Sequence, residues 1–238
     1  MKVSNDLINN NVPAVGQVKG NDCVSFFLAE NADIKILFLG NSITRHGKAE
    51  QLGWFGDWGM AASCKENDYV HKLIGKIGRQ GKKVSYCTAN LSEWERTRNM
   101  RLLTSRYLQA YLFNADIIIV RLGENAELTK FLKEFELCYR KMVEYFSGNG
   151  AKVVLSDLFW EYEPFDCFVK DFAKEKSYGF VQLHDLGCME NMKATGKFKH
   201  AGVAAHPGDI GMENIAERIY RAILICCLTS YPIEKAGF

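Results

Sequence analysis

Ser42 is the residue of this sequence best placed to act as a nucleophile. It stands in the run Gly40-Asn41-Ser42-Ile43-Thr44, directly after an apolar stretch that is typical of a buried strand. A serine hydroxyl attacks a carbonyl carbon when a neighbouring base takes its proton. A serine that only caps a helix suits the same position, so this run by itself leaves the two interpretations about even.

His206 is the histidine that best fits the role of that base. It precedes Pro207 and a helix-period segment over 212–228. Proline favours an extended backbone for the residue before it, so the imidazole is expected on a loop outside the helix, where it can reach a hydroxyl. A lone histidine on a loop is more often a surface residue without a catalytic role. The assignment of His206 as the base therefore depends on its occurrence together with Ser42 and Asn125.

Asn125 is the third of these residues. It closes the run Arg121-Leu122-Gly123-Glu124-Asn125, which follows an apolar stretch over 115–122. A side-chain amide there can donate a hydrogen bond to an oxyanion, and loss of such a donor costs enzymes about 10²–10³ in rate. The alternative is a turn-forming asparagine that caps the next helix. Together, the serine, the histidine and the asparagine are far more specific than any one of them.

Alternating apolar runs and helix-period segments predict the elements that position these residues. Strands are expected at 33–39, 83–88, 115–122, 151–155 and 179–183, and helices at 61–77, 93–113, 126–146, 165–176 and 212–228. This alternation predicts an α/β fold, a flavodoxin-like three-layer α/β/α arrangement with a five-stranded parallel sheet. Ligands bind such sheets beyond the carboxyl ends of the strands, which is where Ser42 and Asn125 fall.

The chain is expected to form a single domain. Its 238 residues, 47% of them hydrophobic, can bury one sizeable core, and no repeat or proline-rich linker divides them. Residues 33–238 are predicted to make up this domain. Residues 1–32, with one candidate strand over 23–28, are expected to be an N-terminal extension packed on it.

Composition argues against several classes of partner. The net charge is +2, from 30 basic and 28 acidic residues that are interspersed, so no nucleic-acid partner is expected. The polar start of the chain lacks the apolar core of a signal peptide and no stretch reaches the length of a membrane span, which predicts a cytoplasmic protein without a membrane partner. The five histidines lack metal-ligand spacing, and no metal or other cofactor is expected.

The order of these motifs resembles the SGNH (GDSL-like) hydrolase superfamily over residues 33–228. GNSIT follows the first strand, GEN a later one, and HPGDIGM precedes the C-terminal helix. The resemblance implies a serine esterase that cleaves small-molecule esters of small acyl groups, on carbohydrate or other polar alcohols, through an acyl-serine intermediate and without a cofactor. By position it makes Ser42 the nucleophile, His206 the general base and then acid, and Asn125 an oxyanion donor beside the N–H of Ser42.

The sequence departs from the family pattern at the residue that orients the histidine. Members commonly carry an aspartate three residues before it, where this chain has Val203. A Ser–His dyad is therefore expected. A backbone carbonyl, or an acid such as Asp209 or Glu124, would then hold the Nδ1–H of His206 and fix the tautomer that leaves Nε2 facing the serine.

A second departure concerns the glycine that lines the oxyanion hole in the family. No glycine follows the strand at 83–88, and Ser92 or Glu93 is expected to supply the backbone N–H instead, with Ser92 preferred. Glu93 and Glu95 have two further interpretations. They either reach the rim of the pocket or pair with arginines, for which Arg96 and Arg121 are the candidates.

Aromatic and cationic residues near these motifs are candidates for substrate binding. Trp58, Trp94 and Arg45 are expected to contact substrate, and Phe159-Trp160 are further aromatic candidates. Aromatic residues more often belong to the core, and Arg45 with His46 has the alternative of a solvated loop pair.

Two other functions stay open at this point. The missing aspartate and glycine permit a non-catalytic SGNH-fold protein that binds a glycan or another small ligand. A phosphate-binding flavodoxin-like protein would use the loop after the first strand to bind its anion, and GNSIT is a weak version of such a loop.

Overall fold

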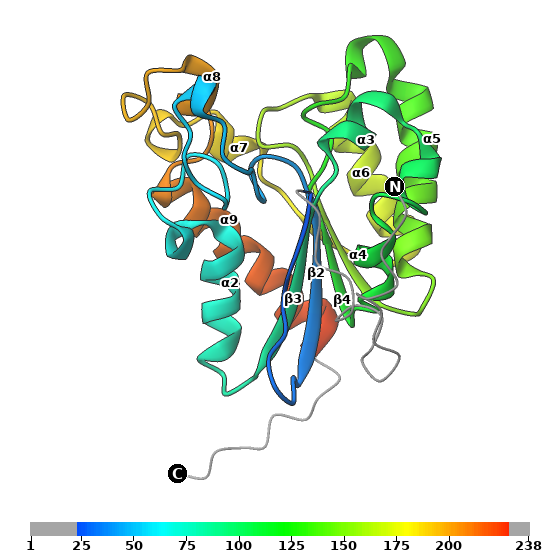
Figure 1. Cartoon of the computed structure of the whole chain (residues 1–238). Coiled ribbons are helices and arrows are strands. Elements are labelled where there is room, and N and C mark those ends of the chain that lie inside the picture. Colours follow the sequence, from blue (N-terminus) through cyan, green and yellow to red (C-terminus); the bar gives the residue numbers. More distant parts are fainter. Residues whose placement is uncertain (1–22, 229–238) are drawn as a thin grey trace, which may run out of the picture.

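The computed structural model describes residues 23–228, which form a central six-stranded sheet (Figure 1). Its strand order is β1-β3-β2-β4-β5-β6. The strands are β1 (Val24–Phe27), β2 (Ile34–Gly40), β3 (Val84–Asn90), β4 (Ile117–Val120), β5 (Lys152–Ser156) and β6 (Gly179–Val181). Strands β2 to β6 are parallel, as predicted, whereas β1 pairs antiparallel with β3 at the edge.

The candidate strand near the N-terminus thus belongs to the sheet itself. Val24 pairs with Ala89 and Phe27 with Tyr86, so this part of the predicted extension extends the sheet by one strand. The rest of that extension, residues 1–22, lies outside the described residues.

Helices cover both faces of the sheet (Figure 1). On one face lie α2 (Tyr69–Gly78) and α9 (Asp209–Ile223), and on the other α4 (Leu108–Leu112), α5 (Leu128–Ser147) and α6 (Glu163–Lys176). Each face has its own apolar cluster, because successive strand residues point to opposite sides: Leu37 and Leu39 to one, Ile36 and Phe38 to the other. The three-layer prediction is therefore confirmed.

The shorter helices and turns connect these layers. They are α3 (Ser92–Thr97), α7 (His184–Gly187), α8 (Ala201–Ala204), the 3₁₀ turns Glu50–Leu52, Lys65–Asn67, Met100–Leu102 and Glu190–Met192, and a π-helical turn, Leu224–Leu228, after α9. Within residues 23–228, no helix is both long enough and apolar enough to cross a membrane.

Two of the predicted helices are shorter in the structure. The helix expected over 93–113 is divided because Arg98 adopts a left-handed backbone conformation, φ 54°, and ends α3. The helix expected over 61–77 begins only at Tyr69, where the carboxylate of Asp68 caps it by accepting the N–H of His71 at 2.8 Å. The chain between Ser42 and α2 is therefore mostly irregular.

The strand order places a reversal point between β2 and β4. The chain leaves β2 for β3 on one side and returns to β4 on the other, with Leu39 of β2 in register with Val120 of β4. Crevices that bind ligands in parallel sheets open at such points, beyond the carboxyl ends of the strands. Ser42 follows β2, and Arg121 to Asn125 follow β4, so both segments lie at this edge.

Candidate active site

A tight turn carries Ser42 away from the end of β2. A Cβ atom on Gly40 would lie 1.7 Å from Oγ1 of Thr44, so only glycine fits beside that side chain. The carbonyl of Asn41 accepts the N–H groups of both Thr44 and Arg45 at 3.0 Å, and the carbonyl of Ser42 accepts the N–H of Met60 at 2.8 Å. The turn is thus fixed on both sides, and Ser42 is left partly exposed.

His206 lies within hydrogen-bond distance of this serine. Its Nε2 is 2.8 Å from Oγ of Ser42, and its Nδ1 is 2.7 Å from the carbonyl oxygen of Gly202 in α8. A carbonyl only accepts, so Nδ1 carries the proton and Nε2 presents its lone pair to the serine. The sequence predicted a Ser–His dyad, and the partner of Nδ1 is the first of its alternatives, a backbone carbonyl.

The two acids considered for that role are engaged elsewhere. Asp209 accepts the N–H of Ser63 at 2.8 Å and its hydroxyl at 2.7 Å, which ties the start of α9 to the loop before α2. Glu124 accepts hydrogen bonds from Arg121 and from the N–H of Phe159. Val203, at the position of the family's aspartate, is buried in a small apolar cluster that includes Trp54.

The surroundings of His206 keep its imidazole neutral. Burial lowers the pKa of His206 to about 4; the Gly202 carbonyl opposes this shift and the charge of Arg121 adds to it. The ring of Trp160 packs edge-on against it, with 5.2 Å between centroids. At neutral pH the histidine is therefore in the form that can accept a proton.

The amide of Asn125 is held by a buried carboxylate, that of Glu95. Nδ2 of Asn125 donates to Oε2 of Glu95 at 2.6 Å. The other oxygen, Oε1, accepts the N–H of Gly123 at 2.5 Å and Nδ2 of Asn41 at 3.1 Å. Because Asn41 directly precedes Ser42, one carboxylate links the nucleophile turn to the segment that carries Asn125.

A second buried carboxylate completes this network. Arg121, which has no exposed surface, donates to Glu124 and to Oδ1 of Asn41, and Nδ2 of Asn41 donates to Glu124 at 2.7 Å. The pairing of Arg121 with Glu93 or Glu95, which the sequence left open, is wrong: Arg121 pairs with Glu124. Glu93 instead pairs with Arg106 at the surface.

The candidate oxyanion donors differ in their availability. Within residues 23–228, no acceptor is hydrogen-bonded to the backbone N–H of Ser42. The amide nitrogen of Asn125 carries two protons, one of which is hydrogen-bonded to Glu95, so the other can be donated to an oxyanion. The N–H of Ser92 is already bound to Oδ1 of Asn90 at 3.0 Å, so it would have to leave that oxygen to reach an oxyanion.

The predicted substrate contacts are only partly at the surface. Trp94 is fully buried and packs against Phe135, so the structure corrects its assignment to the pocket and places it in the core. Trp58 is half-buried, with its indole N–H on the carbonyl of Ala62 at 3.0 Å. Arg45 pairs with Asp57 at 2.7 Å.

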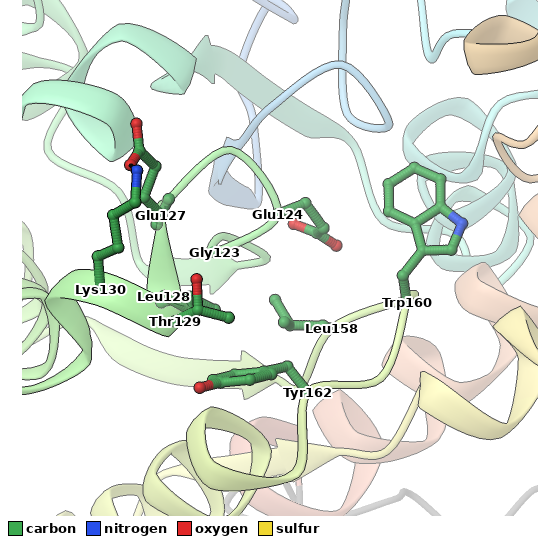
Figure 2. Close-up of a pocket in the computed structure, with 10 residues that line it drawn as sticks. Gly123, Glu124, Glu127, Leu128, Thr129, Lys130, Leu158, Trp160 and Tyr162 are labelled. Carbon is green, nitrogen blue, oxygen red and sulfur yellow. Dashed lines mark hydrogen bonds and ion pairs between the residues drawn. The ribbon is translucent and has the colours of Figure 1, made fainter.

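A pocket opens between the loop after β4 and the loop after β5 (Figure 2). It has a volume of about 420 Å³, and its wall includes Gly123, Glu124 and Trp160, the tryptophan that contacts His206. Glu127 and Lys130 lie at one end and Trp160 at the other (Figure 2). The sequence named Trp160 among the aromatic candidates, and in the structure it lines the pocket and contacts the histidine. In the part of the chain that is described, no group of three or more His, Cys, Asp or Glu side chains is arranged to hold a metal ion.

Comparison with known proteins identifies the fold. No protein-family model and no curated protein sequence matches the chain. Among solved structures, the psychrotrophic esterase EstA from Pseudoalteromonas sp. is 14% identical with a TM-score of 0.56, over 81% of this chain and 98% of that one. The acetyl xylan esterase AlAXEase is 17% identical with a TM-score of 0.54, over 80% and 100%. A protein described as a GDSL-like lipase, from Parabacteroides merdae, is 16% identical with a TM-score of 0.54, over 86% and 98%. The chain therefore has the SGNH hydrolase fold.

Proposed function

We propose that this protein is a serine ester hydrolase that removes small acyl groups from carbohydrate or other polar alcohols. One observation carries the proposal: Oγ of Ser42 lies 2.8 Å from Nε2 of His206, while the Gly202 carbonyl holds Nδ1. A nucleophile, a base and a group that orients the base are the three parts that serine catalysis requires. The esterase names of the fold neighbours support this assignment.

The first half of the reaction forms an acyl-serine. His206 accepts the proton of Ser42 at Nε2 as Oγ attacks the ester carbonyl carbon. The N–H of Ser42 and the second amide proton of Asn125 donate to the oxyanion that forms. The imidazolium then gives its proton to the leaving alcohol as the tetrahedral intermediate collapses. In the second half, His206 takes a proton from water as that water attacks the carbonyl carbon of the acyl-serine. The imidazolium then returns the proton to Oγ of Ser42 as the acid leaves.

The dyad works without a carboxylate on His206 because the tautomer is already set. In a serine protease, loss of the orienting aspartate costs about 10⁴ in kcat, largely through the wrong tautomer. Here the Gly202 carbonyl selects the Nδ1–H form. The lowered pKa of His206, caused by burial, makes its imidazolium a strong acid toward the leaving alcohol and its neutral form a weak base.

The pocket beside His206 is the proposed site for the bound ester. The aromatic face of Trp160 and the polar side chains of Glu127 and Lys130 suit a polar group such as a sugar ring. One structural neighbour is named an acetyl xylan esterase, which supports a small acyl group on a carbohydrate. Trp58 and Arg45, on the chain that follows Ser42, are proposed as further contacts with the substrate.

A panel of 4-nitrophenyl esters and acetylated sugars tests the proposal. Wild-type protein is expected to turn over short-chain esters fastest. Ser42→Ala and His206→Ala are expected to lose about 10³-fold or more in kcat. Ser105→Ala, at an exposed serine whose hydroxyl donates only to the carbonyl of Arg101, is the matched control and should retain full activity. No turnover of any ester, together with no labelling of Ser42 by a fluorophosphonate, would instead favour a ligand-binding protein.

A further inference from the structure

Glu95 is a buried carboxylate that the proposed mechanism does not yet use. It lies on α3, has no exposed surface, and accepts three N–H groups: those of Asn41, Gly123 and Asn125. These three donors come from both segments that build the site, the turn after β2 and the loop after β4. Glu95 therefore joins the turn of the nucleophile directly to Asn125, the candidate oxyanion donor.

We propose that Glu95 is the positioning residue of the oxyanion hole, and that it does so as a carboxylate. This inference rests on the proposed function. With Glu95 in place, the amide of Asn125 presents nitrogen to Oε2, and its second proton is directed to the oxyanion. Through Oε1, the same group fixes Gly123 and the side chain before Ser42.

A carboxylate suits this position because all three partners are donors. An ionised carboxylate only accepts, so it cannot bind the carbonyl oxygen of the Asn125 amide, and the amide keeps one orientation. A glutamine would have one oxygen for three N–H groups. If its oxygen stayed on Gly123 and Asn41, its own NH₂ would face Asn125. The Asn125 amide would then turn its oxygen inward and lose its proper orientation toward the oxyanion.

The charge makes this arrangement sensitive to protonation. Burial, with the neighbouring Glu124 carboxylate as a second cause, raises the pKa of Glu95 well above that of an ordinary glutamic acid. The titratable groups that interact with it are Glu124 from the loop after β4, Tyr107 before α4 and Tyr139 on α5. The nearest cation of this network, Arg121, donates instead to Asn41 and Glu124. A protonated Glu95 donates from one oxygen and so loses one of its three bonds, which loosens the oxyanion hole.

Glu95→Gln tests the role of the carboxylate on an ester that wild-type protein hydrolyses. The variant is expected to lower kcat by about 10–100-fold, with KM changed less than about twofold, because oxyanion donors act mainly in the transition state. Glu175→Gln, at an exposed carboxylate on α6 that pairs with Arg140 at 2.8 Å, is the matched control. Asn125→Ala should lose as much, and the double variant Glu95→Gln/Asn125→Ala should lose much less than the product of the two single losses, because both changes remove the same oxyanion contact.

The pH profile of kcat/KM gives a readout that a merely structural role would not move. The acid limb of wild-type protein is expected at the pKa of Glu95, and in Glu95→Gln it should fall toward that of His206, about 4. If Glu95→Gln does not fold, Glu95→Asp, which keeps the carboxylate, is expected to fold and to retain the wild-type acid limb.

Four outcomes overturn the role of Glu95: unchanged kcat in Glu95→Gln, fully additive losses in the double variant, an acid limb that stays in place in Glu95→Gln, or an acid limb that moves in Glu95→Asp. Wild-type protein without turnover or Ser42 labelling would instead remove the proposed function and this role with it.

Discussion

Replacing Arg121 by methionine should show how far the active site depends on its buried ion pair. Arg121 is completely buried and donates to both oxygens of Glu124 and to Asn41. Methionine keeps most of the apolar volume but removes the charge. Two carboxylates, Glu124 and Glu95, would then share the site with no cation hydrogen-bonded to it. The substitution should therefore affect folding and catalysis together.

The size of the effect follows from the burial of the partners. Removing one member of a buried ion pair costs about 3–5 kcal/mol, because the other charge is left uncompensated. For a domain of this size, that corresponds to a fall in Tm of roughly 6–20 °C. The exposed pair Arg221–Glu217, joined at 2.8 Å, is the matched control, and Arg221→Met should cost less than about 1 kcal/mol.

Urea and thermal unfolding of Arg121→Met, Arg221→Met, Glu124→Gln and the double variant Arg121→Met/Glu124→Gln measure these free energies. The double variant should recover part of the loss, with a coupling energy of about 1–3 kcal/mol, since the change at Glu124 removes the stranded charge. The rate of ester hydrolysis by Arg121→Met should fall even at temperatures at which the variant is fully folded. Equal, small losses in Arg121→Met and Arg221→Met would refute the view that this buried network organises the site.

Three further predictions concern individual side chains. Ring ¹⁵N shifts of His206 should titrate with a pKa of about 4, because burial disfavours the imidazolium, and should report the Nδ1–H tautomer; a pKa of 6.5 or an Nε2–H ring would contradict the geometry. Trp94→Ala should cost about 3–5 kcal/mol of stability but leave KM unchanged in the folded protein, since Trp94 lies in the core. Trp160→Ala should do the reverse: it should lower kcat/KM and raise the pKa of His206 with little loss of stability. An altered KM in Trp94→Ala would contradict the assignment of Trp94 to the core.

The fold could be predicted from the sequence because strands that are buried on both faces of a sheet appear as short, nearly continuous apolar runs. Four of the five parallel strands begin within one residue of their predicted starts, and β4 begins two later, since short apolar runs bounded by turn residues leave little freedom. The division of the helix after β3 was not readable. It depends on a left-handed arginine, Arg98, a conformation that a non-glycine residue adopts only when its surroundings impose it.

The site was readable to the extent that it depends on side chains at strand ends. Ser42 and His206 are 164 residues apart, and each was selected from its position beside an element. The Gly202 carbonyl left no trace in the sequence, because every residue has one. Glu95 did leave a trace: Leu91, Trp94 and Glu95 share one helix face, on which a carboxylate among buried apolar residues signals a buried acceptor. Trp94 lies on this same buried face of the helix, so it belongs to the core and was wrongly predicted to contact substrate.

Mass spectrometry of protein quenched during turnover of an activated acetyl ester tests the central claim most directly. The proposed dyad predicts an acetyl group on the peptide that contains Ser42, present in wild-type protein and absent from Ser42→Ala. It should also be strongly reduced in His206→Ala. An acetyl group on another residue, or equal acylation of Ser42 with and without His206, would contradict it.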